Sequence, residues 1–302
     1  MDLSYLNGWI DSPKDVDKVL ATAENPYLGA CSHSIADTGD GKKQLLYKFV
    51  EKIFGKYPLR EQGIGDCVGF AAAGAVDILT ATEIIMKADL EEWAGLCDTQ
   101  FIYSGSRVIT GGGQLGNQDG SVGGWIVDFM QKYGTLIKKK YGNIDLSTYN
   151  GNIAREWGRP RIGPPKELFS YAKEHLVQTY SQVNTVENAR DALYSGYPIV
   201  VCSNLGFSNK RDSEGFARPE GSWAHAMVAI AMDFEYKRPG FLIQNSWNIW
   251  NTGPKRHEQP DGSFWCDADV FERKMLSAND SWVISNYKGY PLRDIQWGNL
   301  FR

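Results

Sequence analysis

The sequence predicts an α+β protein whose first half is helical and whose second half is rich in strands. The segment 67–86 consists mostly of Ala, Val, Ile and Leu, and an apolar run of this length is typical of a helix buried on all sides. The apolar runs that begin at Tyr197 and cover 226–232 and 241–244 have the length and composition of strands. This segregation favours two lobes that meet at a cleft, which is a usual place for a functional site.

The N-terminal region contains two local patterns. A cluster of Gly and Asp at 37–41 marks a turn, and the apolar spacing over 45–54 predicts a helix. Residues 1–58 otherwise carry no motif, so a propeptide, a structural arm and an added subdomain are the three alternatives for this region.

The middle of the chain contains two more predicted helices. Apolar residues recur at helical spacing over 125–133, and Gly134 is placed to end that helix. Thr185 has the side chain of an N-cap and begins a helix through Leu193, which Gly196 closes.

Length, composition and charge exclude several classes of protein. The chain has 302 residues, of which 42% are hydrophobic and 23% charged, as expected of a globular protein with one large domain or two lobes. Its net charge of −4, from 32 basic and 36 acidic residues, does not indicate a nucleic-acid partner.

Targeting signals are also absent from the sequence pattern. Residues 1–10 lack a basic start and an apolar stretch, so we expect no secretory leader. We expect that no segment approaches the ~20 apolar residues that a membrane span needs. The five cysteines form no close pair that would suggest a metal site. These observations predict a cytoplasmic protein with a free thiol, or one that leaves the cell by lysis or as part of a virion.

Three short segments carry the chemistry. They are Gln62-Gly-Ile-Gly-Asp-Cys67, then Trp223-Ala-His225, and finally Gln-Asn245-Ser-Trp247. A cysteine nucleophile needs a base, the base needs an orienting partner, and the oxyanion formed by attack needs a donor. Cys67, His225, Asn245 and Gln62 could fill these four roles.

These segments resemble the papain-like cysteine peptidases, in which Gln, Cys, His and Asn occur in the same order. The resemblance implies a papain-like two-lobe domain over 59–286, an N-terminal extension over 1–58 and a C-terminal tail over 287–302. Residues 1–58 are shorter than the inhibitory propeptides usual in the family, which favours the structural arm. Gly120 and Ser121 are similar to the family's Gly-rich strand, which implies pairing with an extended substrate backbone.

The resemblance also implies a role for each site residue. Cys67 is the nucleophile at a helix N-terminus, which favours a thiolate, and His225 is the general base that Asn245 orients. Gln62 and the Cys67 N–H stabilise the oxyanion. The sequence departs from the family in having one residue fewer between Gln62 and Cys67, and in having Asp66 beside the nucleophile. The helix start should outweigh the Asp66 charge if that carboxylate points to water.

The leading functional hypothesis is a cysteine peptidase that acts on a polypeptide substrate without metal or organic cofactor. The first alternative keeps the same triad in a cell-wall peptide amidase or an acyltransferase. The second alternative is a structural component of a virion or another particle, with an assembly partner, on a peptidase-like scaffold.

Overall fold

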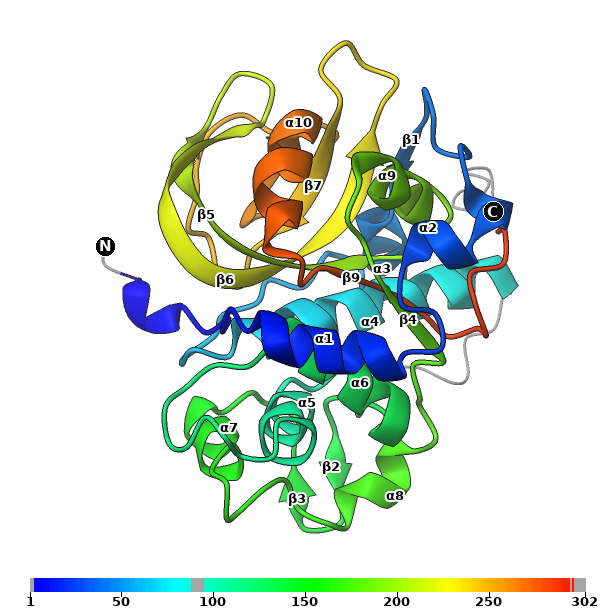
Figure 1. The fold of residues 1–302 in the computed structure, drawn as a ribbon. Coiled ribbons are helices and arrows are strands. Elements are labelled where there is room, and N and C mark those ends of the chain that lie inside the picture. Colours follow the sequence, from blue (N-terminus) through cyan, green and yellow to red (C-terminus); the bar gives the residue numbers. More distant parts are fainter. Residues whose placement is uncertain (1–2, 88–94, 294, 296–302) are drawn as a thin grey trace.

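The computed structural model describes residues 3–87, 95–293 and 295. Two layers make up the fold (Figure 1): a twisted sheet occupies the upper part, and most of the first-half helices occupy the lower part. The helix that begins at Cys67 runs between the two layers, so its N-terminal end lies where the layers meet. This arrangement bears out the predicted α+β fold.

The helices divide into those of the N-terminal region, those of the lower layer and those that pack on the sheet. In chain order they are η1 (Ser4–Leu6), α1 (Pro13–Thr22), α2 (Leu28–Cys31), η2 (His33–Ile35), α3 (Tyr47–Phe54), α4 (Cys67–Lys87), α5 (Gln100–Gly105), η3 (Ser106–Thr110), α6 (Gly123–Tyr133), α7 (Gly151–Trp157), α8 (Leu168–Ala172), α9 (Val186–Tyr194), α10 (Ala268–Val270), η4 (Phe271–Met275) and η5 (Leu276–Ala278).

The strands form one large sheet and one small hairpin. They are β1 (Lys43–Leu45), β2 (Lys140–Tyr141), β3 (Ile144–Asp145), β4 (Thr179–Gln182), β5 (Ile199–Arg211), β6 (Ala217–Asp233), β7 (Gly240–Gln244), β8 (Ser263–Asp267) and β9 (Trp282–Ser285). The large sheet has the order β4-β9-β5-β6-β7-β8, and β1 pairs with β6. Every pairing in it is antiparallel. The consecutive strands β5, β6 and β7 are neighbours in this order.

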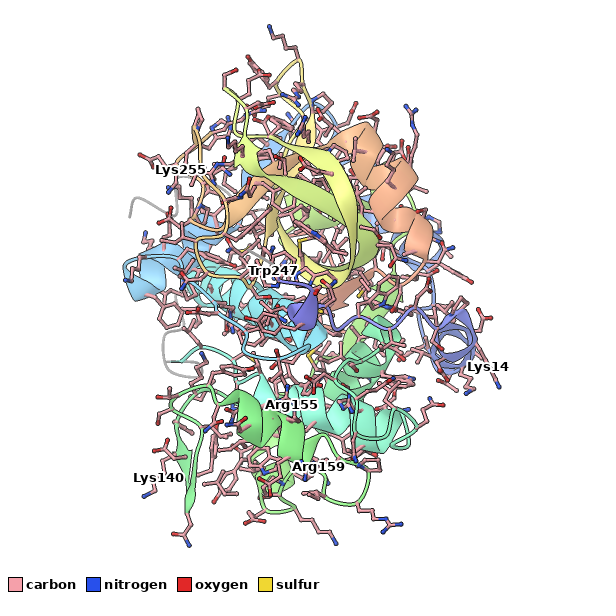
Figure 2. All side chains as sticks on the ribbon, turned by 90° about the vertical axis from the view of Figure 1, so that its left-hand side faces the viewer. Lys14, Lys140, Arg155, Arg159, Trp247 and Lys255 are labelled. Atoms are coloured by element: carbon pink, nitrogen blue, oxygen red, sulfur yellow. The ribbon has the colours of Figure 1, made fainter. Side chains whose placement is uncertain are left out.

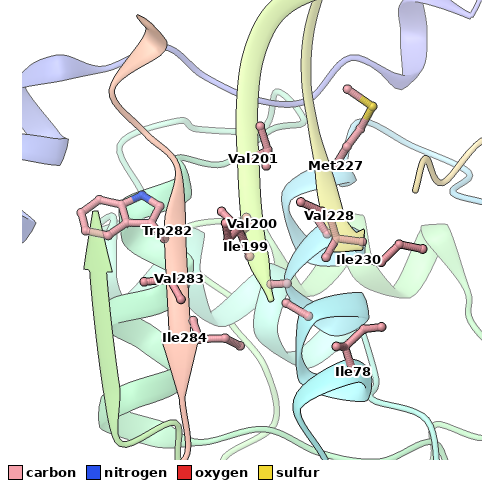
Figure 3. Close-up of a cluster of buried hydrophobic side chains, with 14 of the residues drawn as sticks. Ile78, Ile199, Val200, Val201, Met227, Val228, Ile230, Trp282, Val283 and Ile284 are labelled. Carbon is pink, nitrogen blue, oxygen red and sulfur yellow. The ribbon is translucent and has the colours of Figure 1, made fainter. Parts of the chain in front are cut away.

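The core lies between α4 and the sheet. Figure 3 shows Ile78 of α4 facing a wall of apolar side chains from three strands. These side chains are fully or almost fully buried: Ile199, Val200 and Val201 from β5, Met227, Val228 and Ile230 from β6, and Trp282, Val283 and Ile284 from β9. The all-round apolar sequence of α4 is thus explained by packing on every side.

The same helix corrects one expectation. By length and composition alone, the 20 residues Cys67–Met86 would suffice to cross a membrane, and 89% of the apolar window is buried inside the protein. The expectation that no segment approaches this length is therefore wrong. The core position of α4 accounts for its hydrophobicity.

Several element boundaries differ from those predicted. The predicted helix over 45–54 is shorter, because Leu45 belongs to β1 and pairs with Ala231. β6 begins at Ala217, well before the predicted start at 226, because it pairs with the extended β5 through several register shifts. The helices predicted at 125–133 and 185–193 are confirmed as α6 and α9, and Thr185 caps α9 through its hydroxyl.

Residues 3–58 pack over both layers, since β1 joins the sheet and α1 lies against α6 in the lower layer. Residues 294 and 296–302 of the proposed C-terminal tail, including Trp297, lie outside the described residues. Trp265 and Trp282, near the end of the described chain, are fully buried.

Candidate active site

Cys67 is the first residue of α4 and is fully buried. A tight turn precedes it, in which the Asp66 N–H donates to the Ile64 carbonyl at 2.8 Å. The Cys67 Sγ accepts a hydrogen bond from the backbone N–H of Ala226 at 3.3 Å. The nucleophile candidate therefore lies directly against the strand that carries His225.

His225 and Asn245 are brought together by the register of two adjacent strands. Val228 of β6 pairs with Gln244 of β7, which places the residues just beyond this pair side by side. His225 Nε2 and Asn245 Oδ1 are 2.8 Å apart, and both side chains are buried.

The hydrogen bonds of Asn245 fix the tautomer of His225. Asn245 Oδ1 also accepts from the Ser246 backbone N–H at 2.7 Å, and a backbone N–H can only donate, so this atom is the amide oxygen. His225 Nε2 must then carry the proton, and the lone pair of the neutral ring lies on Nδ1. Within the described part of the chain, Nδ1 has no hydrogen-bond partner, which leaves this nitrogen for proton transfer.

Aromatic rings surround the histidine. Trp247 lies 4.4 Å from the His225 ring, centroid to centroid, and Trp223 packs edge-on against both rings. Figure 2 shows Trp247 where the sheet and the lower helices meet. The indole covers the imidazole next to the His225–Asn245 bond. A cavity of about 990 Å³ adjoins it and is lined in part by Phe207, Trp223 and Trp250.

Gln62 is buried next to the residue after Asn245. Its Oε1 accepts from the Ser246 hydroxyl at 2.6 Å, and its backbone N–H donates to the Ser246 carbonyl at 2.9 Å. Its Nε2 donates to the carbonyls of Leu6 and Ile64, both at 2.8 Å. The Gln62 amide is therefore held rigidly, and one of its donor directions is occupied by the N-terminal segment.

This N-terminal segment, residues 3–10, crosses the site and is called the strap below. The N–H groups of Gly8 and Trp9 both donate to the carbonyl of Ala224 at 3.1 Å. A Cβ at Gly8 would lie only 1.9 Å from the Gly65 carbonyl oxygen, so this close approach requires glycine at position 8.

Gly120 and Ser121, the predicted substrate-binding residues, meet the strap. The Ser121 N–H donates to the Gly8 carbonyl at 2.8 Å, and the Ile10 N–H donates to the Ser121 carbonyl at 2.9 Å. This is a parallel bridge centred on Trp9. Ser121 thus pairs with an extended backbone. The Gly120 carbonyl is turned away to accept from Arg107.

Beyond the site, the strap is anchored by Trp9. The buried indole N–H of Trp9 donates to Asp280 Oδ2 at 2.7 Å, and the same carboxylate accepts from the N–H groups of Gly123 and Gly124 at the start of α6. The sequence analysis missed this anchor. No local pattern links Trp9 with a residue as far along the chain as Asp280.

Burial keeps the cysteine and the histidine neutral. It raises the pKa of Cys67 to about 12, although the N–H groups of Ala226 and Gly8 oppose the shift. It also lowers the pKa of His225 to about 4, against the effect of its bond to Asn245. With the strap in place, a thiol and a neutral imidazole are therefore the forms present at pH 7.

Asp66 does not point to water, so the condition under which the helix start should prevail is not met. The carboxyl group is fully buried and accepts from the Tyr149 hydroxyl at 2.8 Å. Burial raises the pKa of Asp66 to about 8. The carboxyl group is therefore largely protonated at pH 7, which reduces its repulsion of a Cys67 thiolate.

Across residues 3–87, 95–293 and 295, no three His, Cys, Asp or Glu side chains are grouped so that they could hold a metal ion.

Known structures share this fold. Xylellain, a cysteine protease from Xylella fastidiosa, has 18% identity and a TM-score of 0.57, over 93% of this chain and 96% of that chain. Procathepsin L 3 of the Tenebrio molitor larval midgut has 13% identity and a TM-score of 0.52, over 89% of this chain and 79% of that chain. The proform of the ragweed pollen allergen Amb a 11, a cysteine protease, has 13% identity and a TM-score of 0.54, over 93% of this chain and 74% of that chain. No protein-family model and no curated protein matches the sequence.

Proposed function

We infer that this chain, which has the fold of the papain-like cysteine proteases, is a cysteine peptidase whose cleft is covered by its own strap. The observation that carries the proposal is the pairing of His225 Nε2 with Asn245 Oδ1 at 2.8 Å, on the strand that contacts Cys67 Sγ. This pairing leaves the basic nitrogen of His225 without a hydrogen-bond partner among the described residues, on the residue next to Ala226, whose N–H contacts the thiol at the start of α4.

The reaction follows from these positions. His225 Nδ1 takes the thiol proton, and the Cys67 sulfur bonds to the substrate carbonyl carbon while the carbonyl π pair moves to oxygen. Gln62 Nε2 and the Cys67 N–H donate to that oxyanion. The C–N bond then breaks, and the amine leaves with the proton from His225. Water deprotonated by His225 hydrolyses the thioester and restores the thiol.

A polypeptide substrate is favoured by the way the cleft holds the strap. The strap is bound through main-chain groups of Ala224 and Ser121, and one of its carbonyls accepts from Gln62. Such contacts recognise any extended backbone, whereas side-chain pockets select among sequences. The aromatic cavity beside Trp247 is suited to a large apolar side chain.

The strap itself supports a resting state in which peptide binding is blocked. It occupies the Gln62 donor and the Ser121 backbone, the two positions that an extended substrate would need. Displacing it would hydrate the site, which lowers the pKa of Cys67 and raises that of His225, since burial causes both shifts.

The test uses Gly8→Ala in the full chain. The added methyl group cannot be seated against Gly65, and overpacking of about 1–3 kcal/mol would raise the open population by about 5- to 150-fold. We expect iodoacetamide to modify Cys67 faster by a similar factor at pH 7, as read by peptide mapping, and cleavage of a denatured protein substrate to rise with it.

Gly41→Ala is the matched control, because Gly41 is exposed with φ of 61° and has nothing within 4 Å of an added Cβ. It should destabilise the chain slightly without changing Cys67 labelling. If Gly8→Ala releases the strap and Cys67 is neither labelled nor active, the peptidase proposal fails. The structural component on a peptidase-like scaffold, which the covered and neutral site also fits, would then be favoured.

Gln62 provides a second test of the reaction. In the Gly8→Ala background, Gln62→Ala should lower kcat by about 10²–10³-fold, the usual loss for one oxyanion donor. KM should change little, because the oxyanion exists only in the transition state. An increase in KM at constant kcat would instead make Gln62 a ground-state contact and contradict the assignment.

A further inference from the structure

The turn that joins Gln62 to Cys67 is held by a side chain from the lower layer. The Tyr149 hydroxyl accepts from the Gly63 N–H at 3.1 Å and donates to Asp66 Oδ2 at 2.8 Å. One oxygen atom thus spans the turn and ties the residue after the oxyanion donor to the residue before the nucleophile.

The ring of Tyr149 is itself fixed by packing. It lies edge-on to Phe70 of α4, with centroids 4.9 Å apart and planes at 73°. Phe70 is in the first turn of α4, where its N–H donates to the Asp66 carbonyl at 3.2 Å. Tyr149 therefore contacts both the turn and the helix that carries the nucleophile.

A second contact holds the same turn from the other side. The Gly65 N–H lies 3.4 Å from Asp119 Oδ2, and Arg155 donates two hydrogen bonds to the Asp119 carboxylate at 3.0 and 2.7 Å. The turn, which is one residue shorter than that of the papain-like peptidases, is thereby held at both of its inner glycines.

We propose that Tyr149 and Asp66 are positioning residues that set the distance between the two oxyanion donors, the Gln62 amide and the Cys67 N–H. The proposal rests on the peptidase function proposed above. A displaced donor loses most of its effect, since a shift of about 1 Å can lower a rate by about 10²-fold. We call the hydrogen bond between Tyr149 and Asp66 the brace. Because it acts on the oxyanion donors, its loss should slow acyl transfer. Alkylation of the thiol forms no oxyanion, so its rate should not depend on the brace.

The experiment compares these two reactions in the Gly8→Ala background. Tyr149→Phe removes only the hydroxyl and retains the ring on Phe70. We expect kcat for a peptide amide to fall by about 10–100-fold, with KM and the rate of Cys67 alkylation by iodoacetamide nearly unchanged. Tyr171→Phe, which alters a half-exposed ring on α8, is the matched control and should change neither rate.

Asp66 variants separate positioning from charge. Asp66→Asn retains an oxygen that can accept from Tyr149, so we expect kcat to stay close to that of the background, whereas Asp66→Ala should resemble Tyr149→Phe. If kcat of Tyr149→Phe is undiminished, or if kcat and the alkylation rate of Cys67 fall equally, the positioning role of Tyr149 is wrong while the peptidase function still stands. A background variant with neither turnover nor labelling would overturn the brace together with the peptidase function.

Discussion

In the strap-released background, His225→Ala should lower turnover by about 10²–10⁴-fold, the usual contribution of a general acid–base group. The reason is that His225 Nδ1, which has no hydrogen-bond partner among the described residues, is carried by the strand whose Ala226 N–H donates to Cys67 Sγ. Steady-state cleavage of a peptide amide measures the loss, and circular dichroism establishes that the variant is folded.

Asn245→Ala should cost less, because the packing of Trp247 on the imidazole, with centroids 4.4 Å apart, still restrains the ring. The alanine variant should also change the pH profile. The hydrogen bond to Asn245 favours protonated His225, so its loss lowers the pKa of His225 further. The limb of the pH–rate profile that His225 governs therefore moves to lower pH. Undiminished turnover of His225→Ala would refute the assignment of the base.

Asp77→Ala should lower the free energy of unfolding by about 3–5 kcal/mol, as expected when one partner of a buried ion pair is removed. Asp77 of α4 accepts from Arg60 and, at 2.7 Å, from the Cys97 N–H, and both charged side chains are less than 10% exposed. The variant leaves the Arg60 charge buried without its partner. Urea unfolding followed by fluorescence measures the change.

Asp269→Ala is the matched control, because its ion pair with Arg273 is exposed on both sides and should contribute less than about 1 kcal/mol. The double variant Arg60→Met with Asp77→Leu should be more stable than Asp77→Ala, since it removes the unpaired charge. Equal stability of Asp77→Ala and Asp269→Ala would contradict the role assigned to the buried pair.

The helices α3, α4, α6 and α9 and the strands β5, β6 and β7 were predictable from local patterns. The mostly apolar segment 67–86 predicts α4 almost to the residue, whereas its place in the core is shown by the packed structure. The glycines that end α6 and follow α9 have positive φ, as their positions in the sequence indicate. Boundaries were less predictable where pairing decides them: Leu45 is a strand residue because β6 is beside it.

The candidate site was likewise predictable only in part. Residue types and chain order were sufficient to select Cys67, His225, Asn245 and Gln62. Their meeting depends on the register of β6 against β7 and on the contact between Ala226 and Cys67. The position of Asp66 could not be predicted either, since its exposure depends on Tyr149.

By itself, the sequence determined the fold class, the helix that begins at Cys67 and the set of residues proposed for catalysis, because periodicity and composition act locally and each motif is a short segment of neighbouring residues. Only the tertiary structure decided that residues 3–10 lie across the site, that Trp9 is held by Asp280 and that Tyr149 braces the turn before Cys67. These are contacts between residues far apart in the chain, made by main-chain groups and single side chains. Such contacts leave no periodic signal, so they arise only once the packed layers bring the segments together.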